Sequence, residues 1–102
     1  MRDTYVTDLR HFLDDDGELA GGMPSEARQI ASFLALIVDA VSMKSPGPFH
    51  ETGMRCRIKQ CIGGVLARVE SASREIHWEC SLCGHHGLIS NWQNTKWDQR
   101  GG

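Results

Sequence analysis

The sequence lacks an apolar run that could cross a membrane. Its longest apolar stretch, residues 30–41, has ten apolar residues in twelve, whereas a membrane-spanning helix needs about 20. The first residues also lack the apolar region of a secretory signal peptide. We therefore expect a cytoplasmic protein that does not associate with membranes.

Prolines and aromatic residues are few as well, but the composition is otherwise ordinary. The chain has three prolines, 7% aromatic, 40% hydrophobic and 24% charged residues. Such a composition excludes a collagen, a low-complexity tract and a wholly disordered chain. A length of 102 residues fits one domain or two very small ones.

Charge is unevenly distributed about a break in the chain. Residues 1–51 carry four Lys or Arg against nine Asp or Glu, whereas residues 52–102 carry seven against four. Near the boundary lies Ser45-Pro46-Gly47-Pro48, where the prolines prevent a helix from continuing. The sequence therefore predicts a helical segment, a connection and a second unit, at residues 1–43, 44–54 and 55–102.

Two helices are predicted in the N-terminal segment. Residues 4–13 place apolar side chains on one helical face. Residues 24–43 begin with a proline, a serine and a glutamate, which are typical of a helix start, and continue with apolar residues at helical spacing. The apolar surface of helix 24–43 is too wide for one neighbour. Either it is buried within one chain, or it contacts a protein partner or a second copy.

The four cysteines all follow the break and form two close pairs. Their pattern is C-x4-C, then eighteen residues, then C-x2-C. Zn²⁺ takes four ligands in a tetrahedron, and two short turns can each aim two thiolates at one point. A redox C-x2-C motif or two disulfides are the alternatives, but the first explains only one pair and the second needs an oxidising compartment. The sequence thus predicts one structural Zn²⁺ bound by Cys56, Cys61, Cys80 and Cys83.

Glycines and basic residues beside the cysteines favour the same interpretation. Gly84 follows the second pair, and Gly63-Gly64 follows the first. A zinc knuckle turns backbone N–H groups toward sulfur, which often needs a positive φ after the second cysteine. Cationic side chains help to keep thiolates ionised, and three of them surround the first pair: Arg55, Arg57 and Lys59.

The residues around the cysteines have the period of β-strands. Residues 65–70 and 75–80 alternate between apolar and polar side chains, residues 71–74 supply a turn, and residues 87–92 resemble a third strand. The predicted fold class is therefore α+β, with two helices joined to a three-stranded antiparallel zinc ribbon. So small a unit buries little apolar surface, and we expect metal removal to unfold residues 54–98.

Three histidines lie near the cysteines. Because a shell of four cysteines is already complete, His77, His85 and His86 are expected at the surface; the alternative for His85-His86 is a second, weaker metal or a phosphate. A catalytic zinc needs an open coordination position, which four thiolates do not leave. We therefore expect no enzymatic activity and no small-molecule substrate.

The tryptophans allow two interpretations. They either cap a thin core or form a platform on which bases or a peptide stack. With four thiolates and Zn²⁺ included, the C-terminal unit has a charge of about +1, far below the basic footprint of an independent nucleic-acid-binding protein. The residues expected to contact nucleic acid or a partner, if either binds, are Arg55, Arg57, Lys59, Arg68, Trp92, Lys96 and Trp97.

Both ends of the sequence resemble a known family. Residues 76–84 (IHWECSLCG) and 87–98 (GLISNWQNTKWD) are similar to the WECPxCGxxGxIxxWxxTxWD ending of a family of small uncharacterised bacterial zinc-ribbon proteins, and residues 9–17 (LRHFLDDDG) resemble its opening. The resemblance implies a zinc ribbon and its metal site. It implies no reaction, because the family has no established activity.

Three functions follow from these features. We expect a zinc-binding protein-interaction adaptor that contacts its partner through helix 24–43. A nucleic-acid-binding accessory protein is the first alternative, although zinc ribbons suggest it only by analogy of fold. A thiol-redox enzyme is the second, and no nucleophile–base pair or phosphate loop in the sequence favours it.

Overall fold

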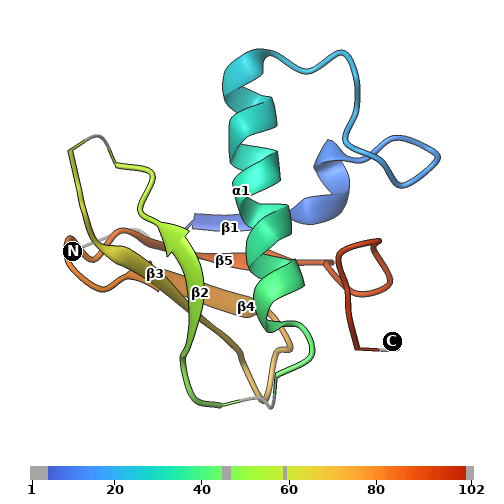
Figure 1. The fold of residues 1–102 in the computed structure, drawn as a ribbon. Helices are drawn as coiled ribbons and strands as arrows, with labels where there is room; N and C mark the ends of the chain where they lie inside the picture. The colour runs from blue at the N-terminus through green and yellow to red at the C-terminus, as the bar shows by residue number, and fades with distance from the viewer. Residues whose placement is uncertain (1–4, 45–46, 59, 101–102) are drawn as a thin grey trace.

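A computed structural model describes residues 5–44, 47–58 and 60–100 of the chain. Ser45 and Pro46 of the predicted connection, and Lys59 of the predicted contacts, lie outside the described residues. The described residues form one α-helix, one 3₁₀ turn and five strands, whose arrangement is drawn in Figure 1. In chain order they are β1 Tyr5–Asp8, η1 Leu9–Phe12, α1 Ser25–Val41, β2 His50–Arg55, β3 Gly64–Val69, β4 Ile76–Cys80 and β5 His86–Ser90.

The five strands form one mixed sheet. Its order is β1-β5-β4-β3-β2, with β1 parallel to β5 and all other neighbours antiparallel. Helix α1 lies across one face of this sheet (Figure 1). The predicted fold class is therefore wrong, since the protein is mostly β with one helix, rather than two helices beside a three-stranded antiparallel ribbon.

The predicted helix over residues 4–13 is instead a strand and a short turn. Strand β1 pairs with β5, so that Val6 lies opposite Leu88, a residue near the other end of the chain. The carboxylate of Asp8 accepts a hydrogen bond from the backbone N–H of Arg10 at 2.9 Å, which caps η1 and ends the strand. Pairing with a distant strand thus outweighs the helical spacing of the apolar residues.

Strand β2 occupies much of the segment expected to be a connection. Its pairing with β3 shifts register between Glu51 and Arg55, and Gly53 has a φ of 78°, which marks a bulge. The hydroxyl of Thr52 donates to the Val65 carbonyl at 2.8 Å and repairs the interrupted ladder. Each of the three predicted parts of the chain, residues 1–43, 44–54 and 55–102, thus contributes at least one strand to the same sheet. The division of the chain into these three parts stays a prediction.

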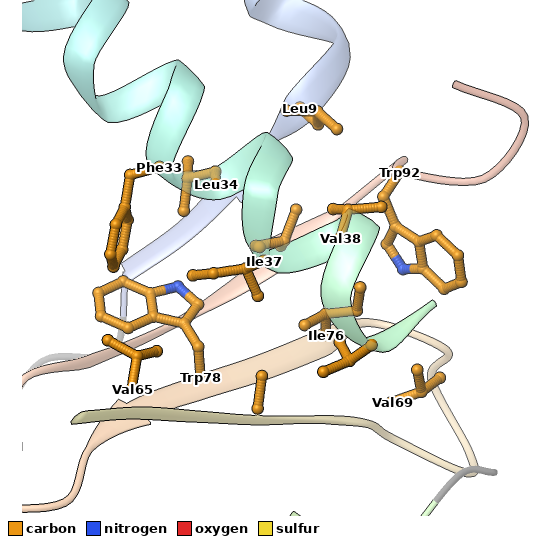
Figure 2. Packing of buried hydrophobic residues seen from close by; sticks show 13 residues of the cluster. Leu9, Phe33, Leu34, Ile37, Val38, Val65, Val69, Ile76, Trp78 and Trp92 are labelled. Carbon is orange, nitrogen blue, oxygen red and sulfur yellow. The ribbon is translucent and has the colours of Figure 1, made fainter. Parts of the chain in front are cut away.

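Helix α1 confirms the helix predicted over residues 24–43, and its apolar face is buried within the chain. Figure 2 shows its side chains above those of the sheet, with the Phe33 ring over that of Trp78. The two ring centroids are 5.3 Å apart and the planes meet edge to face at 84°. Ile30 and Leu36 are the exceptions on α1, at 36% and 51% exposed. No helix in the described part of the chain is long and apolar enough to cross a membrane.

The segment after β5 closes the other end of the core. Trp92 is only 1% exposed, and its indole N–H donates to the Arg74 carbonyl at 2.8 Å. The hydroxyl of Ser42, just after α1, accepts from the backbone N–H of Gln99 at 2.8 Å. The first bond attaches the C-terminal segment to the turn between β3 and β4, and the second attaches it to the end of the helix.

Candidate metal centre

The fold brings all four cysteines to one point. Their sulfur atoms all lie within 4.8 Å of one another. The Sγ atoms of Cys56 and Cys83 are 3.6 Å apart, and so are those of Cys61 and Cys80. Four sulfurs at about 2.3 Å from a central zinc would be about 3.8 Å apart. The cluster can therefore hold a metal ion, and it is the one such group of ligating side chains among the described residues.

The first pair lies on the loop between β2 and β3, which we call the first knuckle (residues 56–63). The backbone N–H of Ile58 donates to Cys56 Sγ at 3.4 Å, and that of Gly63 donates to Cys61 Sγ at 3.5 Å. Gln60 takes a φ of 70°, so the chain turns sharply just before Cys61. This turn aims both sulfurs at the same point.

The second pair lies where β4 ends, on the second knuckle (residues 80–85). The backbone N–H groups of Leu82 and Cys83 both donate to Cys80 Sγ at 3.4 Å. Gly84 has a φ of 78°, as expected for the glycine after a knuckle, and its N–H donates to the Cys80 carbonyl at 3.2 Å. Cys80 is buried while Cys83 is exposed.

Gly63 has a different role from the one expected of it. It does not adopt a positive φ, but a Cβ on this residue would lie 2.5 Å from Cys80 Sγ and 2.7 Å from Leu82 Cβ. The two knuckles therefore touch at a place where no side chain fits. The hydrogen bond from Ser81 N–H to the Gly64 carbonyl, 2.9 Å long, ties the second knuckle to the residue after the first one, and the bond from Cys56 N–H to the Gly63 carbonyl, also 2.9 Å, closes the first knuckle.

The thiols differ in how readily they lose a proton. The backbone N–H groups of Cys83 and Leu82 lower the pKa of the Cys80 thiol to about 6. Burial raises the pKa of the Cys56 thiol to about 12. Since a metal binds thiolates, cation binding must displace the protons that remain. Metal affinity should therefore fall as the pH is lowered.

The basic residues predicted as contacts lie apart. The guanidinium of Arg57 lies 5.6 Å from the centroid of the Phe33 ring, beside the first knuckle. Arg55 ends β2 and is exposed. Arg68 alternates with the buried residues of β3, so it points away from α1, toward Glu70 at 3.2 Å.

The remaining predicted contacts lie near the C-terminus. Trp92 is part of the core, and Trp97 packs against that core partly buried. Lys96 pairs with Glu18, and its ammonium lies 5.4 Å from the centroid of the Trp97 ring.

The described histidines are not part of the cysteine cluster. His77 Nδ1 lies 3.3 Å from a carboxylate oxygen of Glu70, on the sheet face away from α1. His85 packs against Trp78 with ring centroids 5.1 Å apart. Burial, and then the charge of Arg57, lowers the pKa of His85 below its ordinary value. Within the described ranges no histidine joins two other metal-ligating side chains.

A small cavity lies beside the metal centre. It has a volume of about 220 Å³, and its walls come from β1, α1, β4 and both knuckles. Because residues distant in sequence form it, no local pattern indicates it.

No family model, curated protein or solved structure matches the chain. The resemblance to small bacterial zinc-ribbon proteins therefore stays a prediction, and the chemistry of the site must be inferred from its own residues.

Proposed function

We propose that the four cysteines bind one structural Zn²⁺ and that the protein acts as a protein-interaction adaptor. The convergence of four sulfur atoms within 4.8 Å carries the metal assignment. An all-thiolate tetrahedron suits zinc, with iron as the other metal that such ligands hold. Reduced, metal-bound thiols suit a reducing compartment, and we place the protein in the cytoplasm.

A structural rather than catalytic metal is supported by the completeness of the shell. Four thiolates occupy all four positions of a tetrahedral zinc and leave none for water or substrate. The N–H groups that donate to Cys56, Cys61 and Cys80 stabilise bound thiolates and lower their nucleophilicity. A thiol-redox activity would need one of these sulfurs to leave the metal.

An adaptor is favoured by apolar side chains that the knuckles expose. Ile62 is 80% exposed, Leu82 is 65% exposed and Ile58 is 44% exposed. Ile62 and Leu82 lie on the two knuckles, which touch at Gly63, and exposed apolar side chains brought together in this way are typical of protein contacts. The nucleic-acid alternative has less support, because Trp92 is buried and Arg68 already pairs with Glu70.

Two measurements test this proposal. Elemental analysis of protein purified without added metal should give one zinc per chain, whereas iron or no metal would contradict the assignment. Zinc-loaded protein should retain a protein from a host extract, and the chelated protein should not. Salt-sensitive binding to single-stranded DNA, with no protein retained, would favour the nucleic-acid alternative instead.

A further inference from the structure

The cavity beside the metal centre has aromatic walls and an open mouth. Phe33 and Trp78 meet edge to face within it, and we call it the aromatic pocket. Ile30, at 36% exposed, forms part of its lip on α1. Figure 2 shows that the Phe33 and Trp78 rings lie together at one end of the hydrophobic core. At this end the first half of α1 covers the sheet. The pocket is thus a continuation of the hydrophobic core that the chain leaves unfilled.

One full charge lies at the pocket. Arg57 reaches it from the first knuckle and places its guanidinium over the Phe33 ring. Among the described side chains, no carboxylate lies within ion-pair distance of this guanidinium. Three other cations do have acidic partners, namely Arg68, Lys96 and Arg100. An aromatic-lined pocket with an unpaired arginine at its rim is complementary to an apolar group that carries a negative charge beside it.

The volume of the pocket limits what can enter. Sites for drug-sized molecules and cofactors occupy roughly 300–1,000 Å³, whereas this one has about 220 Å³. That space suits one bulky side chain, which is how a protein partner anchors itself in a pocket.

From these observations we propose that the aromatic pocket receives one bulky apolar side chain of a protein partner, and that an acidic residue next to it in the partner pairs with Arg57. The inference rests on the proposed adaptor function and gives that function a place and a recognition chemistry. It also explains why Ile30 and Arg57, from segments distant in sequence, lie at one opening.

A blocked seven-residue peptide with a central phenylalanine flanked by two glutamates is the probe. It is titrated into ¹⁵N-labelled, zinc-loaded protein up to about 5 mM, a range suited to a single anchoring side chain. We expect the indole N–H signal of Trp78 to shift progressively. A peptide with alanine in place of phenylalanine, and one with lysines in place of glutamates, should each bind several-fold more weakly.

Variants of the protein locate the binding. Ile30→Ala removes part of the lip and should weaken peptide binding about two- to fivefold; Arg57→Ala removes the cation and should weaken it by a similar factor. Leu36→Ala is the matched control, since Leu36 is exposed on the same helix but does not line the pocket. It should bind like the wild type.

Each result decides one of the two proposals. The pocket assignment would be overturned by any of three results. The Trp78 indole signal does not shift, the alanine peptide binds as tightly as the phenylalanine peptide, or Leu36→Ala weakens peptide binding as much as Ile30→Ala does. If the host partner is retained equally by wild type, Ile30→Ala and Arg57→Ala, the adaptor function stands but this pocket is not its site. If the peptide binds as expected and no host protein is retained, the pocket stands and the adaptor function fails.

Discussion

The contact of the two knuckles at Gly63 gives the sharpest prediction for the metal centre. In the variant Gly63→Ala the new methyl group would lie 2.5 Å from Cys80 Sγ, where real Cβ atoms stay at least 3.0 Å from other heavy atoms. The sulfur or the first knuckle must therefore move by 0.5 Å or more. Zinc–ligand distances tolerate only about 0.2 Å. The substitution therefore strains the metal shell.

The cost can be estimated from overpacking elsewhere in proteins. A methyl group forced into a closely packed site costs about 1–3 kcal/mol. If that strain falls on the metal-bound state, zinc affinity drops by about 5- to 150-fold. Leu82 Cβ lies 2.7 Å from the same position, so retreat of Cys80 alone does not relieve the clash.

Gly64 provides a control one residue away. An alanine Cβ there would meet only the Met54 carbonyl oxygen, at an ordinary 3.9 Å. Gly64→Ala should therefore keep its zinc affinity and its stability within about 0.5 kcal/mol of the wild type. Both variants are compared by competition for Zn²⁺ with a chromophoric chelator and by thermal unfolding. Equal zinc affinity of the two variants would refute the knuckle geometry described above.

Three further predictions concern the fold. Structural zinc supplies about 10–16 kcal/mol of apparent binding free energy, as much as the whole stability of a small domain, so complete chelation should abolish the near-ultraviolet circular dichroism; an unchanged spectrum would contradict a structural metal. Trp92→Ala should cost about 3–5 kcal/mol in chemical denaturation, because the side chain is fully buried and donates to Arg74; a cost below about 1 kcal/mol would place Trp92 outside the core. Hydrogen bonds from Arg100 lower the pKa of Asp98 to about 2, so the contribution of the Asp98 carboxylate to stability is complete above the ordinary carboxyl pKa and is lost as the pH falls toward 2. Asp98→Asn should remove that part of the pH dependence of stability. An unaltered profile of stability against pH in this variant would contradict the role of Asp98.

The features that the sequence predicts well are those that depend on near neighbours. Helix α1 follows from its proline start and the apolar spacing after it, and β3 and β4 follow from alternation across a short turn. The cysteine cluster has the same origin, because each pair is set by one tight turn and the hairpin between the pairs returns the chain. Such features need no knowledge of the rest of the molecule.

The features that the sequence misses depend on distant partners. Residues 4–13 have helical spacing of apolar residues, and Tyr5–Asp8 within them forms a strand because it pairs with β5, some eighty residues later. Strand β2 contains Gly53 and a bulge, both of which weaken a strand pattern. Phe33 and Arg57 meet only after α1 and the first knuckle have been placed by the sheet. Local propensity is a weak guide wherever tertiary pairing supplies the larger free energy.

The position of the metal centre links its structural role to the proposed recognition site. The cysteines lie at the ends of β2, β3 and β4, where strands would otherwise fray, and Cys80 is both a candidate ligand and a buried residue two positions from Trp78. Arg57 directly follows a cysteine of the first knuckle and His85 belongs to the second, yet both side chains reach aromatic rings of the pocket. A metal that fixes the knuckles therefore also fixes the polar rim of the pocket, while α1 and the sheet supply its apolar walls. Recognition of a partner would then depend on the metal without any partner atom touching it.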